Sequence, residues 1–379
     1  MTFKFQKLFQ MIYKEIETQE ALIDILVQND LLETIVFQNV DFTIIAEIAQ
    51  EKKYNNCLFL GCKLPETWEN IKTEKCLIFP TIDVPFNVYI STLYDSQKLY
   101  GDYIMGKPET FALTLDQKIY RDFNDNNQHI RNIKVTLAQR IHDHSITDAL
   151  SDFLSKYDEK KIVAIMGGHQ LLRSDREFFE IALLSKKLTE NGYLMVSGGG
   201  PGAMEATHVG AWFGGKEDKV LEQACNILGE APDFKNPLWL DKAMQVLSNH
   251  PVSDFESVGV PTWLYGHEPT TPFASKIAKY FENSIREEGL LTIAKGGIIF
   301  TPGSAGTLQE IFQETVQNHY LVYGYASPMI FFGKNYWTEV IPVYPFFQLM
   351  IEKGKYKNLI VSIYDETEEI LNELNRFSE

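Results

Sequence analysis

Apolar and polar positions alternate between strand and helix patterns from about residue 161 onward. The apolar run that ends at Met166 predicts a buried strand, and one-sided apolar spacing predicts a helix over roughly 175–190. The pattern continues with strands at 193–197, 258–265, 297–301, 328–332 and 359–363, and with helices from 203 and over 272–287, 307–318, 341–353 and 366–376. Since parallel strands need crossover helices, this order predicts an α/β fold with a doubly wound, Rossmann-like parallel sheet.

The first 100 residues follow a different pattern. Apolar residues at near-helical spacing predict a helix over 5–30. Short β-like pieces follow, at Thr34–Phe37, Phe42–Ile45, Cys57–Leu60 and Cys76–Phe79. No internal repeat stands out. We therefore expect residues 1–100 to form a separate N-terminal α+β domain, whose role the sequence does not indicate.

Two further segments separate or interrupt these patterns. Residues 101–160 are predicted as a helical connector, with amphipathic stretches at 133–141 and 146–157 and a loop over Asp122–Gln128. Residues 216–255 interrupt the alternation of strands and helices within the predicted domain 161–379. We interpret this interruption as an insertion that either packs against the domain or covers a site.

Composition narrows the range of partners. The chain has 379 residues and a formal net charge of −16, whereas nucleic-acid binding needs a basic surface. Backbone N–H groups can still bind a small anion without positive side chains. The spacing of Cys57, Cys62, Cys76 and Cys225 does not match a zinc site. We expect reduced thiols in a cytoplasmic protein, with no membrane segment, no cofactor and no metal.

Three glycine-rich turns each directly follow a predicted strand. They lie at 167–169, 198–202 and 302–307. In an open parallel sheet, ligands bind at the carboxyl ends of the strands. One such turn is weak evidence, because a tight turn alone can require glycine. Three of them in one sheet favour a shared crevice for a phosphate or nucleotide.

The turn at 302–307 carries the most chemical information. Gly303 and Gly306 let several backbone N–H groups converge at a helix N-terminus, and Ser304 and Thr307 add hydroxyl donors. A Gly-Lys-Ser/Thr sequence is absent, which favours a monophosphate over a triphosphate. The dinucleotide fingerprint is also absent at 167–169, which argues against NAD. The candidate substrate-binding residues are Gly168, His169, Gly199, Gly200, Gly202, Met204, Glu205, Gly303, Ser304, Ala305, Gly306 and Thr307.

Two of these segments together resemble a known family. The stretch from Gly198 to Ala206, followed about a hundred residues later by Pro302 to Glu310, is similar to the motifs of the Lonely guy family, formerly called lysine-decarboxylase-like. Its members include bacterial nucleotide 5′-monophosphate nucleosidases. The resemblance covers about 161–335. It implies a Rossmann-like domain that dimerises, with its site near the dimer interface.

The resemblance also implies a reaction and roles for individual residues. Many members hydrolyse the N-glycosidic bond of nucleoside monophosphates, releasing free base and ribose 5-phosphate. The turn 303–307 would hold the 5′-phosphate, and Glu310 matches the catalytic glutamate. Ser304 replaces the usual second glycine. The expected arginine position, about fifteen residues before Pro302, holds Glu287, and Arg286 lies one residue earlier.

Two functions follow as hypotheses. The first is a nucleoside 5′-monophosphate phosphoribohydrolase, in which Glu310 and Arg286 are catalytic and face one cavity beside the 302–307 turn. The alternative is a non-catalytic nucleotide sensor with a regulatory N-terminal domain. Both predict an AMP-like ligand and a homodimer or higher homo-oligomer, without nucleic acid or membrane as a partner.

Overall fold

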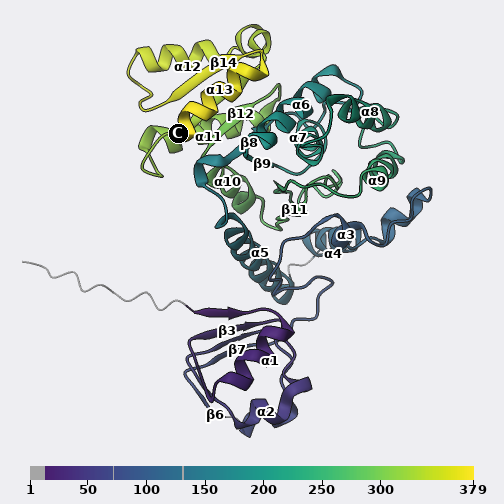
Figure 1. Ribbon diagram of the computed structural model, residues 1–379, viewed down its shortest axis with the longest axis vertical. Coiled ribbons are helices and arrows are strands. Elements are labelled where there is room, and N and C mark those ends of the chain that lie inside the picture. Colours follow the sequence, from purple (N-terminus) through teal and green to yellow (C-terminus); the bar gives the residue numbers. More distant parts are fainter. Residues whose placement is uncertain (1–12, 71, 130–131) are drawn as a thin grey trace, which may run out of the picture. The chain divides into compact units, whose positions relative to one another are not determined.

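The computed structural model describes residues 13–70, 72–129 and 132–379 (Figure 1). The chain divides into two compact units. One unit comprises Met1–Thr92 and Ile130–Ala149, and the other comprises Leu93–His129 and Leu150–Glu379. The segment 101–160, predicted as a connector, is thus divided between the two units. Within the described ranges, every helix is too short or too polar to cross a membrane.

The first unit is a coil of parallel strands. One sheet contains β1 (Lys14–Ile16), β3 (Ile35–Gln38), β5 (Leu58–Leu60) and β7 (Leu77–Phe79), and a second contains β2 (Leu31–Glu33), β4 (Lys53–Asn55) and β6 (Lys72–Glu74). Each coil passes through both sheets, and helices α1 (Gln19–Gln28) and α2 (Ala46–Glu51) form return segments. Val36 pairs with Leu58, and Leu58 pairs with Leu77, so equivalent positions recur at intervals of 22 and 19 residues.

An aromatic core holds these coils together. Phe37 and Phe59 stack with ring centroids 5.1 Å apart, and Phe42, Tyr54 and Trp68 pack around them. This repeat is not evident in the sequence, because a stacked coil needs only recurring inward apolar positions, not recurring residue identities. The same constraint explains two wrong predictions. Of the helix predicted over 5–30, Gln19–Gln28 is observed as α1, whereas Ile16 lies in strand β1. Thr43–Ile45, predicted as part of a β-like piece, is a 3₁₀ turn. The remainder of the predicted helix at 5–12 lies outside the described residues.

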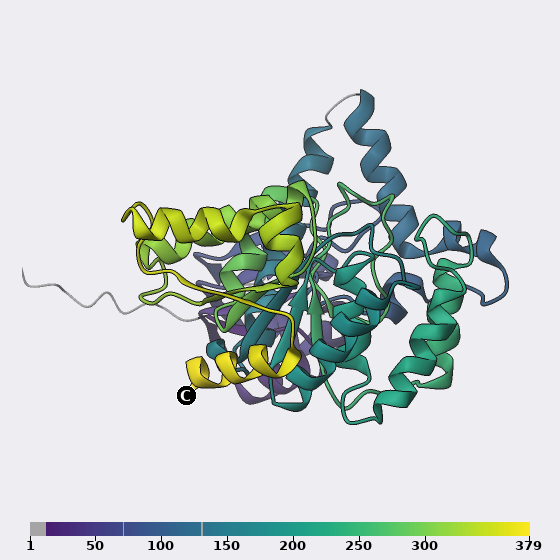
Figure 2. The ribbon, with the colours of Figure 1, turned by 90° about the horizontal axis from the view of Figure 1, so that it is seen from above.

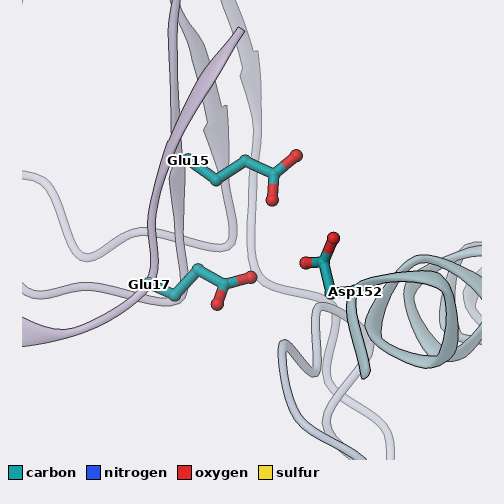
Figure 3. Close-up of side chains that lie close together, drawn as sticks. All are labelled: Glu15, Glu17 and Asp152. Carbon is teal, nitrogen blue, oxygen red and sulfur yellow. The ribbon is translucent and has the colours of Figure 1, made fainter. Parts of the chain in front are cut away.

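The first strand presents carboxylates on its outer side. Ile16 is buried, whereas Glu15 is exposed and Glu17 is partly exposed. Figure 3 shows the side chains of Glu15 and Glu17 on the same side of the strand, as the two-residue period of a β-strand requires. The third labelled residue, Asp152, lies in the other unit, on helix α5 (Ile133–Leu154).

The second unit contains a seven-stranded parallel sheet. Its strand order is β11-β10-β9-β8-β12-β13-β14. The bounds are β8 (Ile162–Met166), β9 (Leu194–Ser197), β10 (Ser257–Gly259), β11 (Lys276–Ile277), β12 (Gly297–Phe300), β13 (Pro328–Phe332) and β14 (Ile360–Tyr364). The first strand along this chain segment is central, and later strands add first to one side and then to the other. This is the doubly wound order of a Rossmann-like fold, and it confirms the predicted fold class.

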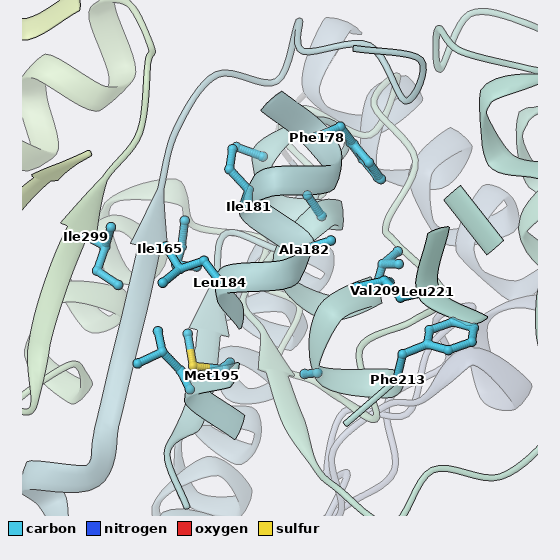
Figure 4. Close-up of a cluster of buried hydrophobic side chains, with 14 of the residues drawn as sticks. Ile165, Phe178, Ile181, Ala182, Leu184, Met195, Val209, Phe213, Leu221 and Ile299 are labelled. Atoms are coloured by element: carbon cyan, nitrogen blue, oxygen red, sulfur yellow. The ribbon is translucent and has the colours of Figure 1, made fainter. Parts of the chain in front are cut away.

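Helices cover both faces of this sheet (Figure 2). On one face, α6 (Arg176–Glu190), α7 (Ala203–Trp212) and α13 (Thr367–Ser378) pack against strand residues that include Ile165, Met195 and Ile299 (Figure 4). On the other, Phe331 contacts Phe347 of α12 (Val343–Glu352), with ring centroids 6.0 Å apart. The remaining helices are α3 (Ser96–Tyr100), α4 (Leu115–His129), α8 (Asp218–Gly229), α9 (Trp239–Asn249), α10 (Asn283–Ile293) and α11 (Ala305–Tyr320).

The structure differs from several of the elements predicted after residue 100. Asp122–Gln128, predicted as a loop, lies within helix α4, and the two amphipathic stretches after it form the single helix α5. The strand predicted at 258–265 is only β10, and 272–287 contains strand β11 and the beginning of α10. The segment 216–255 forms helices α8 and α9 with the loop between them.

Candidate functional site

The three glycine turns meet at the carboxyl edge of the sheet. Strands β8 and β12 are neighbours where the strand order reverses, so the turns after them are adjacent. The Gly168 N–H donates to the Pro302 carbonyl at 3.0 Å, and the Ala203 N–H donates to the Gly168 carbonyl at 3.2 Å. A Cβ atom at Gly202, where φ is +72°, would lie 2.4 Å from the Gly168 carbonyl oxygen. The close approach of these turns therefore requires glycine at this position.

The turn at 302–307 presents unpaired backbone donors to solvent. Helix α11 begins at Ala305, and the first N–H groups of a helix have no partner within it. Ser304, Ala305 and Gly306 are exposed, whereas Thr307 is buried. The Tyr336 hydroxyl donates to the Gly303 carbonyl at 2.7 Å, which holds one side of the turn. Nothing in the sequence pattern had singled out Tyr336.

Arg286 lies against the second glycine turn. Its Nε donates to the Val260 carbonyl at 2.8 Å, and its Nη2 approaches the Gly198 carbonyl at 3.4 Å. A Cβ atom at Gly198 would lie only 2.2 Å from that Nη2. The neighbouring Glu287 instead accepts a hydrogen bond from Gln309 Nε2 on α11 at 2.8 Å. Of the two residues at the expected arginine position, Arg286 is therefore the one beside the turn.

Glu310 lies in the second turn of helix α11 and is partly exposed. The pKa of its carboxyl is raised to about 7, mainly by desolvation. The positive charge of Arg286 opposes this rise, and the negative charge of Glu287 adds to it. Burial also raises the pKa of Glu314 to about 7, but this carboxyl is buried and accepts a hydrogen bond from the Ser327 hydroxyl at 2.7 Å. A raised pKa alone thus does not mark a site. Glu310 differs in its solvent access and in the nearby arginine.

Met204 and Glu205, both predicted to bind ligand, lie within the wall of the crevice. The Met204 side chain packs beneath Gly198 and Gly200. Glu205 is fully buried and forms a bidentate ion pair with Arg173, with N···O distances of 2.6 and 2.7 Å. Arg173 also donates to the Trp239 carbonyl at 2.8 Å. Glu205 therefore ties helix α7 to the 216–255 insertion, with both of its oxygens facing Arg173.

A series of buried hydrogen bonds fixes the backbone of the turn at 198–202. The Gly199 N–H donates to Ser197 Oγ at 3.1 Å, and Ser197 Oγ lies 2.8 Å from His208 Nε2. His208 Nδ1 lies 2.9 Å from Ser257 Oγ. Burial lowers the pKa of His208 to about 3, so this imidazole is neutral at physiological pH. A neutral ring between two hydroxyls fixes the backbone of Gly199 without adding charge.

His169 and Glu268 form a polar edge above the turns. His169 Nε2 lies 3.9 Å from Glu268 Oε1, and His267 Nε2 lies 3.8 Å from the same oxygen. A Cβ atom at Gly200 would lie 3.9 Å from Glu268 Oε2. The sequence places Glu268, like His169, directly after a predicted strand, where it either contacts the base or sugar or only shapes its loop. Its position after a parallel strand was the only available signal.

Comparisons with known proteins find matches among solved structures only. No protein-family model and no curated protein matches this chain. A solved structural-genomics target called TM1055 is 20% identical, with a TM-score of 0.36, and the match covers 57% of this chain and 98% of that one. A molybdenum cofactor binding protein from the phototrophic bacterium Rippkaea orientalis is 13% identical, with a TM-score of 0.35, and the match covers 57% and 97% of the two chains.

The strand order and the glycine turns define the fold around the site independently of these matches. Strands β10, β9, β8, β12, β13 and β14 follow the 3-2-1-4-5-6 order of a Rossmann-like sheet. The turns after β8 and β12 meet at its switch point. The second unit is therefore a Rossmann-like α/β domain, the fold that the resemblance of its motifs to the Lonely guy family implies.

Proposed function

We propose that the second unit is a nucleoside 5′-monophosphate phosphoribohydrolase of the Lonely guy type. The turn at 302–307 binds the 5′-phosphate through the N–H groups at the beginning of α11 and through the Ser304 hydroxyl. The ribose then lies toward Glu310, which is in the next turn of the same helix. The observation that carries this proposal is that Arg286, which contacts the 198–202 turn, acts electrostatically on the Glu310 carboxyl.

The chemistry of hydrolysis suits these two side chains. The bond between C1′ and the base nitrogen breaks, and its electron pair leaves with the base. Water supplies a hydroxyl group to C1′, and its remaining proton balances the charge on the departing base. A carboxylate near C1′ stabilises the cationic, oxocarbenium-like transition state. The Arg286 guanidinium supplies a positive charge that stabilises the negative charge of the departing base or of the phosphate. Its hydrogen bonds to the Val260 and Gly198 carbonyls hold it in place.

A panel of nucleotides tests this proposal. The purified chain is incubated with AMP, GMP, IMP, CMP and UMP, and free base and ribose 5-phosphate are followed by chromatography. Equal amounts of the two products from at least one nucleotide support the hydrolase. The absence of both products with all five nucleotides would contradict the proposed hydrolase.

A non-catalytic nucleotide sensor is the second candidate. The observation in its favour is the N-terminal coil, a compact unit with its own aromatic core. A sensor binds nucleotide without turnover. Its signature in the same panel is a rise in melting temperature on adding nucleotide, with no release of base.

The rate of base release should increase with pH. Burial raises the pKa of Glu310 to about 7, so this carboxyl is protonated below that pH and ionised above it. If the carboxylate is the active form, kcat/KM for AMP falls about tenfold per pH unit below about pH 7 and is constant above it. The measurement is kcat/KM from about pH 5.5 to pH 9. A single inflection near pH 6, where a 5′-phosphate titrates, would contradict the assignment to Glu310.

We also propose that this chain forms a homodimer through the outer face of helix α11. Phe312, Val316 and Tyr320 recur every four residues and are 41%, 54% and 73% exposed. Phe346 of α12 extends this surface, with its ring centroid 6.0 Å from that of Phe312. A continuous exposed apolar stripe of this kind is typical of an interface. The interface would begin a few residues after the phosphate turn.

Val316→Asp should convert the dimer into a monomer, because it places a charge in the centre of the apolar stripe. Light scattering after size-exclusion chromatography gives the mass of each species. Val252→Asp is the matched control, since Val252 is 66% exposed and lies outside the stripe. A wild-type chain that is already monomeric at micromolar concentration, or a Val316 variant that stays dimeric, would contradict this interface.

A further inference from the structure

A cavity of about 190 Å³ opens directly beside the glycine turns. His169, Pro201 and Gly202 line one side of it. The other side comes from the loop between α8 and α9, with Phe234 and Lys235, and from Trp239 at the beginning of α9. The 216–255 insertion therefore does more than pack against the domain, because it supplies one wall of a cavity whose other wall is the candidate site.

This wall is anchored to the site by buried contacts. The Arg173 guanidinium lies over the Trp239 ring, 4.0 Å from its centroid, and donates to the Trp239 carbonyl. The same guanidinium holds both oxygens of Glu205. Glu205 lies in helix α7, which begins at the 198–202 turn. The insertion and the glycine turn are thus held in a fixed relation by one buried arginine.

The cavity combines flat apolar surface with a polar edge. The Phe234 ring centroid lies 6.4 Å from that of His169, with the two planes at 69°. His169 in turn faces Glu268, at 3.9 Å. A nucleobase has the complementary character, since its faces stack on aromatic rings and its edge forms hydrogen bonds. Phe234, Lys235 and Trp239 also line a second cavity of about 480 Å³, which continues toward Phe111.

On the basis of the proposed function, we infer that this cavity binds the purine base of the nucleotide, with Phe234 stacking on the face of the base. Gly168 contacts the phosphate turn through Pro302, and the next residue, His169, lines the cavity. A single nucleotide can therefore place its phosphate at 302–307 and its base against Phe234. The adjoining second cavity leaves room for a two-ring base. The insertion becomes the element that recognises the base.

Binding of two ligands with and without a base tests this inference. The first is formycin A 5′-monophosphate, whose purine-like base is joined to ribose by a carbon–carbon bond and is not hydrolysed. The second is ribose 5-phosphate, which lacks a base. Calorimetric titration of Phe234→Ala should show at least about a fivefold loss of affinity for the first ligand, because stacking on an aromatic ring is lost. Affinity for ribose 5-phosphate should stay within twofold. Phe79→Ala, at a half-exposed phenylalanine of the other unit, is the matched control and should leave both affinities unchanged.

The other outcomes separate this inference from the proposed function. If wild type binds both ligands and Phe234→Ala leaves both affinities unchanged, the base lies elsewhere and only the inference fails. Equal losses of affinity for both ligands would mean that Phe234 supports the phosphate turn. This result would also contradict the stacking of the base on Phe234. If wild type binds neither ligand, the proposed function itself fails.

Discussion

Replacing Glu310 with glutamine is expected to slow base release from a nucleoside monophosphate by about 10²- to 10³-fold. Glutamine keeps the size and hydrogen-bonding capacity of the side chain but cannot carry negative charge. The positive charge that develops at C1′ in the transition state then loses its counter-charge, and the loss of one such preorganised group typically has this magnitude. Because Glu310 is only partly buried, the substitution should not disturb folding. The measurement is kcat for the best nucleotide of the panel.

The matched control for this substitution is Glu314→Gln. Glu314 lies one helical turn further along α11 and has the same raised pKa of about 7, but its carboxyl accepts a hydrogen bond from Ser327 and is buried. Glutamine can keep that hydrogen bond, so activity should remain close to that of wild type. A Glu310→Gln protein that retains more than about a tenth of wild-type kcat would exclude an electrostatic role for the Glu310 carboxylate.

The sheet and its glycine turns could be predicted because their signals are local. A central parallel strand is buried on both faces, so β8 and β13 appear in the sequence as unbroken apolar runs. The turns after β9 and β12 carry glycine where backbones approach closely, as at Gly202 and Gly303. Topology then requires the carboxyl ends of neighbouring strands to share an edge. No knowledge of distant contacts is needed for this step.

The wrong element predictions occur where contacts between residues far apart in the sequence override the local pattern. Asp and Asn residues disfavour a helix over 122–128, but Ile119 and Phe123 are buried and packing stabilises helix α4. Apolar residues such as Trp263 and Phe273 are buried in irregular loops, which the pattern cannot distinguish from a strand or a helix. Phe234 and Glu268 reach the site from such loops. The part of Phe234 became visible only with the tertiary structure, whereas the position of Glu268 directly after a predicted strand already indicated it.

Asp116→Ala is expected to destabilise the second unit by about 3–5 kcal/mol. The Asp116 carboxylate and the Lys279 ammonium lie 2.5 Å apart, and both side chains are fully buried. Lys279 also donates to Thr270 Oγ1 at 2.9 Å and lies over the Trp263 ring. Removal of the carboxylate leaves an ammonium without its counter-ion in a low-dielectric interior, which is the costly case for buried pairs. Denaturant unfolding measures the loss of stability. The transition of the second unit is recognised as the one that nucleotide binding shifts.

Two further variants show whether this cost comes from the orphaned charge or from a general loss of packing. The double replacement Asp116→Leu with Lys279→Met removes both charges at similar volume, and it should recover most of the stability because apolar side chains often substitute well for a buried pair. The exposed pair Lys118–Asp102, which joins the same helix α4 at 3.1 Å, provides the surface comparison. Asp102→Ala should cost less than about 1 kcal/mol. A double replacement that is as unstable as Asp116→Ala would mean that the ion pair is itself needed to hold helix α4 beside the loop that carries Glu268.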